Sequence, residues 1–168
     1  MDGWNKDHVI EDYPMKEVTS FQIGGPVDYF IEPRSEEELK DVIVSVERDE
    51  MPWMIMGKGT NMVVSDKGIR GAVIRLENYF SDVRVDGMRV VAQSGASMKK
   101  VAEAARDASL TGLEFAHGIP GAVGGAMTMN AGAYGGEMKD VVESVKVMYH
   151  DGTTEVIPGD QMDFRYRN

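Results

Sequence analysis

The sequence predicts a mixed α+β (α/β) protein built as two small lobes. Short apolar strand patterns alternate with amphipathic helix patterns, and this alternation is typical of α/β folds. Two glycine-rich segments, residues 57–61 and 118–136, fall one in each predicted lobe. The length of 168 residues suits one ordinary domain or two such lobes.

The first lobe opens with a predicted strand over residues 27–32, which ends at Pro33. Ser35 then begins a helix as its N-cap, and Glu38, three residues on, predicts a capping box. Apolar residues at helical spacing mark the face that we expect to be buried: Leu39, Val42, Ile43 and Val46.

Pro52 ends this helix, and three further strands are expected in the lobe. They are residues 53–56, 63–64 and 72–74. The lobe closes near Leu76, which divides the chain into two predicted subdomains at residues 1–76 and 77–168.

The second lobe is expected to hold two hairpins and one helix. Turn residues Asp86-Gly87 and Asp151-Gly152 predict the hairpins, because such pairs favour tight two-residue turns. Ser97 caps the helix between them. The apolar positions of that helix are mostly small and suit close packing: Val101, Ala104, Ala105 and Ala108.

Residues 118–136 form the most informative segment of the chain. Glycine loses more backbone entropy on folding than any other residue and brings no side chain to pack. A segment this rich in glycine therefore indicates that main chain lies against something flat or anionic, such as a bulky cofactor. Tight turns and close helix packing are the alternative uses of its glycines.

Residues 57–61 follow a strand and read Gly57-Lys58-Gly59-Thr60-Asn61. Such a turn presents successive backbone N–H groups, and concave arrays of these groups bind phosphate oxygens. The spacing is neither that of a P-loop nor that of a dinucleotide fingerprint. Thr60 and Asn61 can add side-chain donors, whereas Lys58 is equally compatible with a solvated side chain.

Composition excludes several classes of protein. The formal net charge of −10 argues against nonspecific nucleic-acid or anionic-membrane binding. No cysteine is present, so disulfides and thiolate chemistry are absent, and three isolated histidines give no metal-ligand spacing. No apolar run is long enough to cross a membrane, and the amino terminus does not resemble a signal peptide. We expect a soluble cytoplasmic protein with no metal.

Taken in order, the motifs resemble those of the UDP-N-acetylenolpyruvoylglucosamine reductase family of flavoenzymes, also called UDP-N-acetylmuramate dehydrogenases. The resemblance runs from about Pro14 to the last residue. The matching motifs are Thr19-Ser20-Phe21-Gln22-Ile23-Gly24-Gly25-Pro26, Gly57-Lys58-Gly59-Thr60-Asn61, Gly71-Ala72-Val73-Ile74, Gly112-Leu113-Glu114-Phe115-Ala116-His117-Gly118-Ile119-Pro120-Gly121, Met129-Asn130-Ala131-Gly132-Ala133-Tyr134-Gly135 and Tyr166-Arg167-Asn168.

The resemblance implies a two-lobed FAD-binding domain of the vanillyl-alcohol-oxidase (PCMH) type, and it implies the residues of the site. Residues 57–61 would hold the FAD pyrophosphate, and residues 118–136 would lie along the pyrophosphate and isoalloxazine. The cofactor-binding residues would be Gly57, Lys58, Gly59, Thr60, Asn61, Met62, Gly118, Ile119, Pro120, Gly121, Val123, Gly124, Gly125, Asn130, Ala131, Gly132 and Ala133. Tyr134 and Tyr166 would contact substrate, and Arg167 would be catalytic. The alternatives are that Tyr134 only packs and that Arg167 is solvated, and His117 is expected to be structural.

Family members continue past the Tyr-Arg-x-Ser motif into a substrate-binding domain, whereas this sequence stops at Asn168. The resemblance therefore implies the FAD-binding portion of an NADPH-dependent oxidoreductase, expected to be inactive alone. The whole enzyme converts UDP-GlcNAc-enolpyruvate to UDP-N-acetylmuramate in peptidoglycan synthesis, and so serves cell wall biogenesis, cell shape and division. Two alternatives stay open: an FAD-dependent oxidase of the same fold, and a noncatalytic nucleotide-binding module.

Overall fold

The computed structural model of the chain describes residues 4–165. The chain divides into two compact units, one of Met1–Tyr79 with Met148–Thr154 and one of Phe80–Val147 with Glu155–Asn168. The assignment of residues 1–76 and 77–168 as two FAD-binding subdomains remains a prediction.

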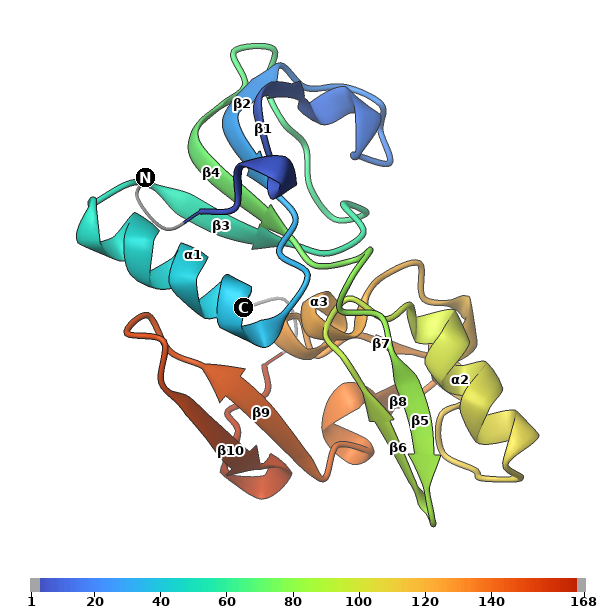
Figure 1. Cartoon of the computed structure of the whole chain (residues 1–168). Coiled ribbons are helices and arrows are strands. Elements are labelled where there is room, and N and C mark those ends of the chain that lie inside the picture. Colours follow the sequence, from blue (N-terminus) through green and yellow to red (C-terminus); the bar gives the residue numbers. More distant parts are fainter. Residues whose placement is uncertain (1–3, 166–168) are drawn as a thin grey trace. The chain divides into compact units, whose positions relative to one another are not determined.

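A four-stranded sheet forms the centre of the first unit, with helix α1 (Glu36–Arg48) beside it (Figure 1). The strands are β1 (Val9–Pro14), β2 (Pro26–Ile31), β3 (Trp53–Met56) and β4 (Ile69–Arg75), in the order β1-β2-β4-β3. β4 is parallel to both β2 and β3, whereas β1 is antiparallel to β2. The predicted strands at residues 27–32, 53–56 and 72–74 are confirmed.

Helix α1 begins as predicted, with the Glu38 N–H donating to Ser35 Oγ at 3.1 Å. The reciprocal bond of a capping box is missing, because the Glu38 carboxylate accepts instead from the Arg34 N–H and contacts His8 Nδ1. The apolar residues of the expected face are buried: Leu39, Val42, Ile43 and Val46.

Two elements of the first unit differ from the expectation. Residues 63–64 are not a strand, because they run through the long connection from β3 to β4 and find no strand partner. Strand β1 was not predicted, since its residues alternate poorly and its middle is exposed at the sheet edge. Buried side chains from strands and loops form one core: Met15, Val18, Val27, Phe30, Met56, Val64 and Val73.

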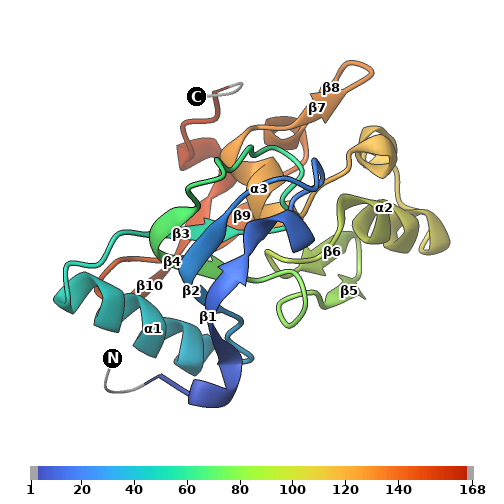
Figure 2. The same cartoon turned by 90° about the horizontal axis from the view of Figure 1, so that it is seen from above.

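The second unit holds the predicted hairpin of β5 (Val83–Asp86) and β6 (Arg89–Ala92) and the helix α2 (Met98–Asp107), which lies beside both strands (Figure 2). The Lys100 N–H donates to Ser97 Oγ at 3.2 Å, which confirms the N-cap. The buried face of α2 is Met98, Val101, Ala102 and Ala105. The expected Ala108 is exposed, because the helix ends one residue before it.

The segment that carries the second glycine cluster is made of short elements. They are the 3-10 turn η3 (Glu114–Gly118), helix α3 (Val123–Thr128), the hairpin of β7 (Gly132–Ala133) and β8 (Gly136–Glu137), and the 3-10 turn η4 (Met138–Asp140). The core below them contains Met98, Ala102, Phe115, Ala116, Ala126 and Met138. The remaining 3-10 turns are η1 (Lys6–His8), η2 (Met15–Glu17) and η5 (Gly159–Gln161).

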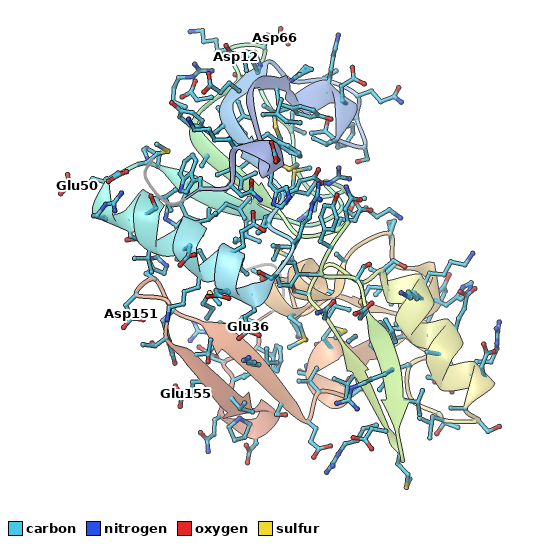
Figure 3. The ribbon with its side chains drawn as sticks, in the orientation of Figure 1. Asp12, Glu36, Glu50, Asp66, Asp151 and Glu155 are labelled. Carbon is cyan, nitrogen blue, oxygen red and sulfur yellow. The ribbon has the colours of Figure 1, made fainter. Side chains whose placement is uncertain are left out.

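The predicted second hairpin is confirmed as β9 (Ser144–Met148) and β10 (Thr154–Pro158). Its turn belongs to the first unit and packs on α1, since a Cβ at Gly152 would lie 2.7 Å from Lys40 Cγ. Figure 3 labels Asp151 at this turn and Glu36 at the start of α1. No helix within residues 4–165 is long and apolar enough to cross a membrane.

Gly71 fixes the irregular start of strand β4. Its φ is +108°, and a Cβ there would overlap the Pro52 carbonyl oxygen. We expect Gly71→Ala to lower the free energy of unfolding by about 3 kcal/mol, through backbone strain and overpacking together. Gly87 (φ +60°), whose Cβ would meet no atom within 4 Å, is the matched control and should lose about 1 kcal/mol on substitution by alanine. Equal losses in urea unfolding would contradict this explanation.

Candidate functional site

The loop after β3 contains a run of backbone amides that the chain leaves unpaired. Within the described residues, no N–H group from Gly57 to Val64 donates to a backbone or side-chain acceptor. Buried N–H groups in proteins nearly always have a partner, and Gly59 and Val64 are the buried residues of this loop. The loop also lies at the carboxyl end of a strand in the parallel part of the sheet, where α/β folds commonly bind ligands.

Hydrogen bonds and packing contacts from the segment that follows η2 fix the conformation of this loop. The Ser20 N–H and the Ser20 hydroxyl both donate to the Gly59 carbonyl, at 3.1 and 3.3 Å. Thr19, which is buried, donates through Oγ1 to the Ile23 carbonyl at 2.8 Å. Gly59 has a φ of +66°, and a Cβ there would overlap the Val18 carbonyl oxygen. Gly59 is therefore required by packing inside the unit.

Three side chains of the loop are available to a ligand. Lys58 and Asn61 are exposed and Thr60 is half-buried, and none of them bonds to another described residue. A hydroxyl, an amide and an ammonium group thus border the unpaired amides. This arrangement suits a phosphate or pyrophosphate group.

Five glycines of the second segment fall into two groups. A Cβ on Gly124 would lie 3.1 Å from Ser94 Cβ, one on Gly132 would lie 2.7 Å from the Gly136 carbonyl oxygen, and one on Gly136 would lie 2.8 Å from the Phe115 ring. Packing within the second unit accounts for these three. The alternative use of glycine that the sequence left open is therefore real at these positions.

Gly118 and Gly125 belong to the other group. Both have ordinary φ angles, and a Cβ on either would meet no atom within 4 Å. Gly125 lies inside helix α3, where glycine costs about 0.5–1 kcal/mol relative to alanine. Neither the backbone nor the packing of the described chain requires these two glycines, so they keep open space at the surface of the unit.

Not every amide of the second segment is available. The Val123 N–H donates to the Ala96 carbonyl at 2.8 Å, and the Gly124 N–H donates to the Ser94 carbonyl at 2.7 Å. These bonds attach the start of α3 to the loop before α2. Val123 and Gly124 remain predicted site residues, although their N–H groups are already used.

Asn130 is 2% exposed and its side chain is used inside the unit. Its Nδ2 donates to Glu137 Oε2 at 2.8 Å, and its Oδ1 accepts from the Lys139 N–H at 3.0 Å. The neighbouring Ala131 donates its N–H to Ala126 and accepts from Met138. Sequence reasoning missed Glu137; the signal that could have found it is the acidic pair Glu137 and Asp140 at capping-box spacing.

The β7–β8 hairpin presents Tyr134 at its tip. Tyr134 is 98% exposed and has a φ of +54°, and Gly135 follows with a φ of +88°. A hollow of about 230 Å³ lies beside the hairpin, lined by Gly132, Ala133, Gly135, Gly136 and Glu137.

The structure thus groups the expected site residues by unit. Residues 57–62 form one loop of the first unit, and residues 118–134 form a continuous segment of the second. The expected substrate and catalytic residues Tyr166 and Arg167 lie outside the described residues. Among residues 4–165, no three His, Asp or Glu side chains are arranged to hold a metal ion.

Comparison with known proteins gives one family. Residues 27–157 match the model of the FAD binding domain family. The UDP-N-acetylenolpyruvoylglucosamine reductase of Clostridioides difficile is 45% identical over 163 residues, which are 97% of this chain and 54% of that protein. That of Clostridium botulinum (Type A, ATCC 19397) is 47% identical over 161 residues, 96% of this chain and 52% of that one.

Solved structures show the same fold as this chain. The UDP-N-acetylenolpyruvylglucosamine reductase of Thermus caldophilus has a TM-score of 0.76 at 34% identity, covering 95% of this chain and 55% of that chain. Alkyldihydroxyacetonephosphate synthase, at 16% identity and a TM-score of 0.66, covers 92% of this chain and 32% of that one, and shares the fold alone. The expected mixed α/β fold of PCMH type is confirmed, and the chain spans about half the length of its curated relatives.

Glu137 gives a prediction for pH. Bonds from Lys139 and Asn130 to its carboxylate hold the pKa of Glu137 below its ordinary value. A lowered pKa means that the folded state favours the charged form, so the contribution is present above about pH 4.5 and is lost as pH falls through the folded pKa. We expect Glu137→Gln to be less stable than the unaltered chain at pH 7, and the difference to shrink towards pH 3. A difference that grows on acidification, measured by urea unfolding, would contradict the sign.

Proposed function

Since the chain belongs to the FAD-binding domain family, we propose that its two glycine-rich segments bind FAD. The chain would be the FAD-binding part of a flavin-dependent oxidoreductase that reduces UDP-GlcNAc-enolpyruvate to UDP-N-acetylmuramate with NADPH. This reaction and its place in peptidoglycan synthesis come from the relatives' names and the motif resemblance, and are proposals for this chain. A cytoplasmic location is likewise a proposal, which comes from the sequence alone.

The unpaired amides from Gly57 to Val64 are the observation that carries the cofactor assignment. A pyrophosphate needs several donors at close range, and backbone N–H groups supply them without bringing counter-charges. In a chain with a net charge of −10, a site built from amides attracts phosphate locally, where the overall charge repels it. Thr60, Asn61 and Lys58 would complete this half of the site.

Gly118 and Gly125 support the other half of the assignment. A flat ring system can lie directly against main chain only where no Cβ projects, and these two positions are open. We propose that the surface around them receives the flavin part of the cofactor, together with the neighbouring Ile119, Pro120 and Gly121. Asn130, Gly132 and Ala133 would shape the adjoining hairpin.

The protein's part in the proposed reaction is to bind and to orient. Bound FAD would supply hydride-transfer chemistry. Tyr134 and Tyr166 would contact the nucleotide-sugar substrate. Arg167 would grip its carboxylate, because a planar guanidinium stays charged and can bond two oxygens at once.

Gly125 gives a direct test of the cofactor site. We expect Gly125→Val to weaken FAD binding at least about tenfold, a loss of roughly 1.4 kcal/mol, while the melting temperature changes little. Gly124→Ala is the contrasting variant, because its Cβ presses on Ser94 and should lower the melting temperature. Flavin fluorescence quenching measures the affinity. Unchanged affinity in Gly125→Val would overturn the assignment of this surface.

The expected inactivity of the 168 residues alone also stays a prediction. The chain corresponds to about half of its relatives, and substrate positioning and acid catalysis each contribute several kcal/mol to typical enzymes. We expect FAD-loaded chain to show no NADPH oxidation that depends on UDP-GlcNAc-enolpyruvate. A substrate-dependent rate of about 1 per second or more, which is ordinary for enzymes, would contradict this.

A further inference from the structure

The base of the β7–β8 hairpin is closed by a compact polar network. Asn130 Nδ2 donates to Glu137 Oε2 at 2.8 Å, and the Lys139 ammonium lies 2.7 Å from the same oxygen. The Lys139 N–H donates to Asn130 Oδ1 at 3.0 Å. Glu137 and Asp140 add reciprocal bonds between side chain and backbone. Asn130, before the hairpin, is thereby joined to the residues after it.

The hairpin cannot set its own geometry. Each of its strands has two residues, and hairpins this short are not stable by themselves. Positive φ angles at both Tyr134 and Gly135 are those of a type I′ turn, in which Asn-Gly is the favoured pair. Tyrosine is strained at the first of these positions, and its exposed ring gains no packing within the described chain.

We infer that Asn130 and Glu137 are positioning residues that hold Tyr134 in its strained, exposed conformation for contact with substrate. The inference rests on the proposed function, which assigns Tyr134 to the nucleotide sugar. If this turn had been selected for stability alone, we would expect asparagine in place of Tyr134. The network offsets the strain of a residue whose ring and hydroxyl can serve a ligand.

Two isosteric exchanges test the network without a ligand. Asn130→Asp keeps a side chain that tolerates a positive φ but sets two carboxylates against each other, and Glu137→Gln removes the charge. We expect hydrogen exchange of the amides of residues 136–140 to become at least about tenfold faster in each. The double variant Asn130→Asp/Glu137→Gln reverses donor and acceptor, so it should recover much of the protection.

The control for these variants is Glu143→Gln. Its carboxylate forms an exposed pair with Arg89 in the same unit and does not contact the hairpin. We expect its exchange pattern at residues 136–140 to match that of the unaltered chain. Single variants that exchange no faster than this control, or a double variant no better than the worse single one, would overturn the network.

A double-mutant cycle of Asn130→Asp and Tyr134→Asn tests whether the network acts through Tyr134. Tyr134→Asn should keep or slow the exchange of the hairpin amides, because it relieves the turn, yet bind UDP-GlcNAc-enolpyruvate roughly tenfold more weakly in calorimetry with FAD-loaded chain. Asn130→Asp should also weaken binding when Tyr134 is present. In the Tyr134→Asn background it should add little, since coupled residues are non-additive.

The outcomes separate the inference from the proposed function. An unaltered chain that binds no FAD overturns the proposed function, and the exchange experiments still decide whether the network holds the hairpin. A Tyr134→Asn variant that binds UDP-GlcNAc-enolpyruvate as tightly as the unaltered chain overturns the assignment of Tyr134 to substrate. An equal effect of Asn130→Asp in both backgrounds overturns the positioning role alone.

Discussion

A backbone N–H group needs an acceptor from protein, water or ligand, and the loop from Gly57 to Val64 provides none for its own. The rest of the first unit holds this loop in place. Parallel strands β3 and β4 bring the chain to the sheet edge, and Ser20 fastens the Gly59 carbonyl from below. With the carbonyl of Gly59 turned inward, the loop offers donors to whatever binds there. The N–H donors belong to the main chain, so substitution of the exposed side chains does not remove them.

Glycine serves two different purposes in this protein. At Gly59, Gly71 and Gly124 a Cβ would meet atoms of the same unit, so glycine there permits the fold itself. At Gly118 and Gly125 nothing in the chain occupies the space that a Cβ would take. The sequence alone cannot distinguish these two kinds of glycine, because it does not show which atoms a Cβ at each position would meet. Only the second group points to a ligand, and it is the smaller one.

Regular elements were predictable wherever local rules decide them. Helix α1 follows from Ser35 and the apolar spacing, and both hairpins form near the expected Asp-Gly pairs. The expected tight Asp-Gly turns are wrong in detail, because Asp86 is still paired with Arg89 and the second loop spans residues 149–153. Two predictions were wrong because they depend on tertiary contacts. Residues 63–64 have no neighbouring strand to pair with, and the Glu38 carboxylate contacts Arg34 and His8 instead of completing the capping box. The motif resemblance identified the two segments of the candidate site, and their role in cofactor binding stays a prediction. The roles of Ser20 and Glu137 were not predictable, because they depend on contacts that only the folded chain creates.

Amide hydrogen exchange resolved by residue tests whether the amides from Gly57 to Met62 bind phosphate. FAD and riboflavin share the isoalloxazine, but only FAD carries a pyrophosphate. We expect saturating FAD to slow exchange across residues 57–62. Riboflavin should leave these amides unchanged and affect residues near Gly125. Exchange at residues 57–62 that FAD does not alter, or that riboflavin slows equally, would contradict phosphate binding by these amides.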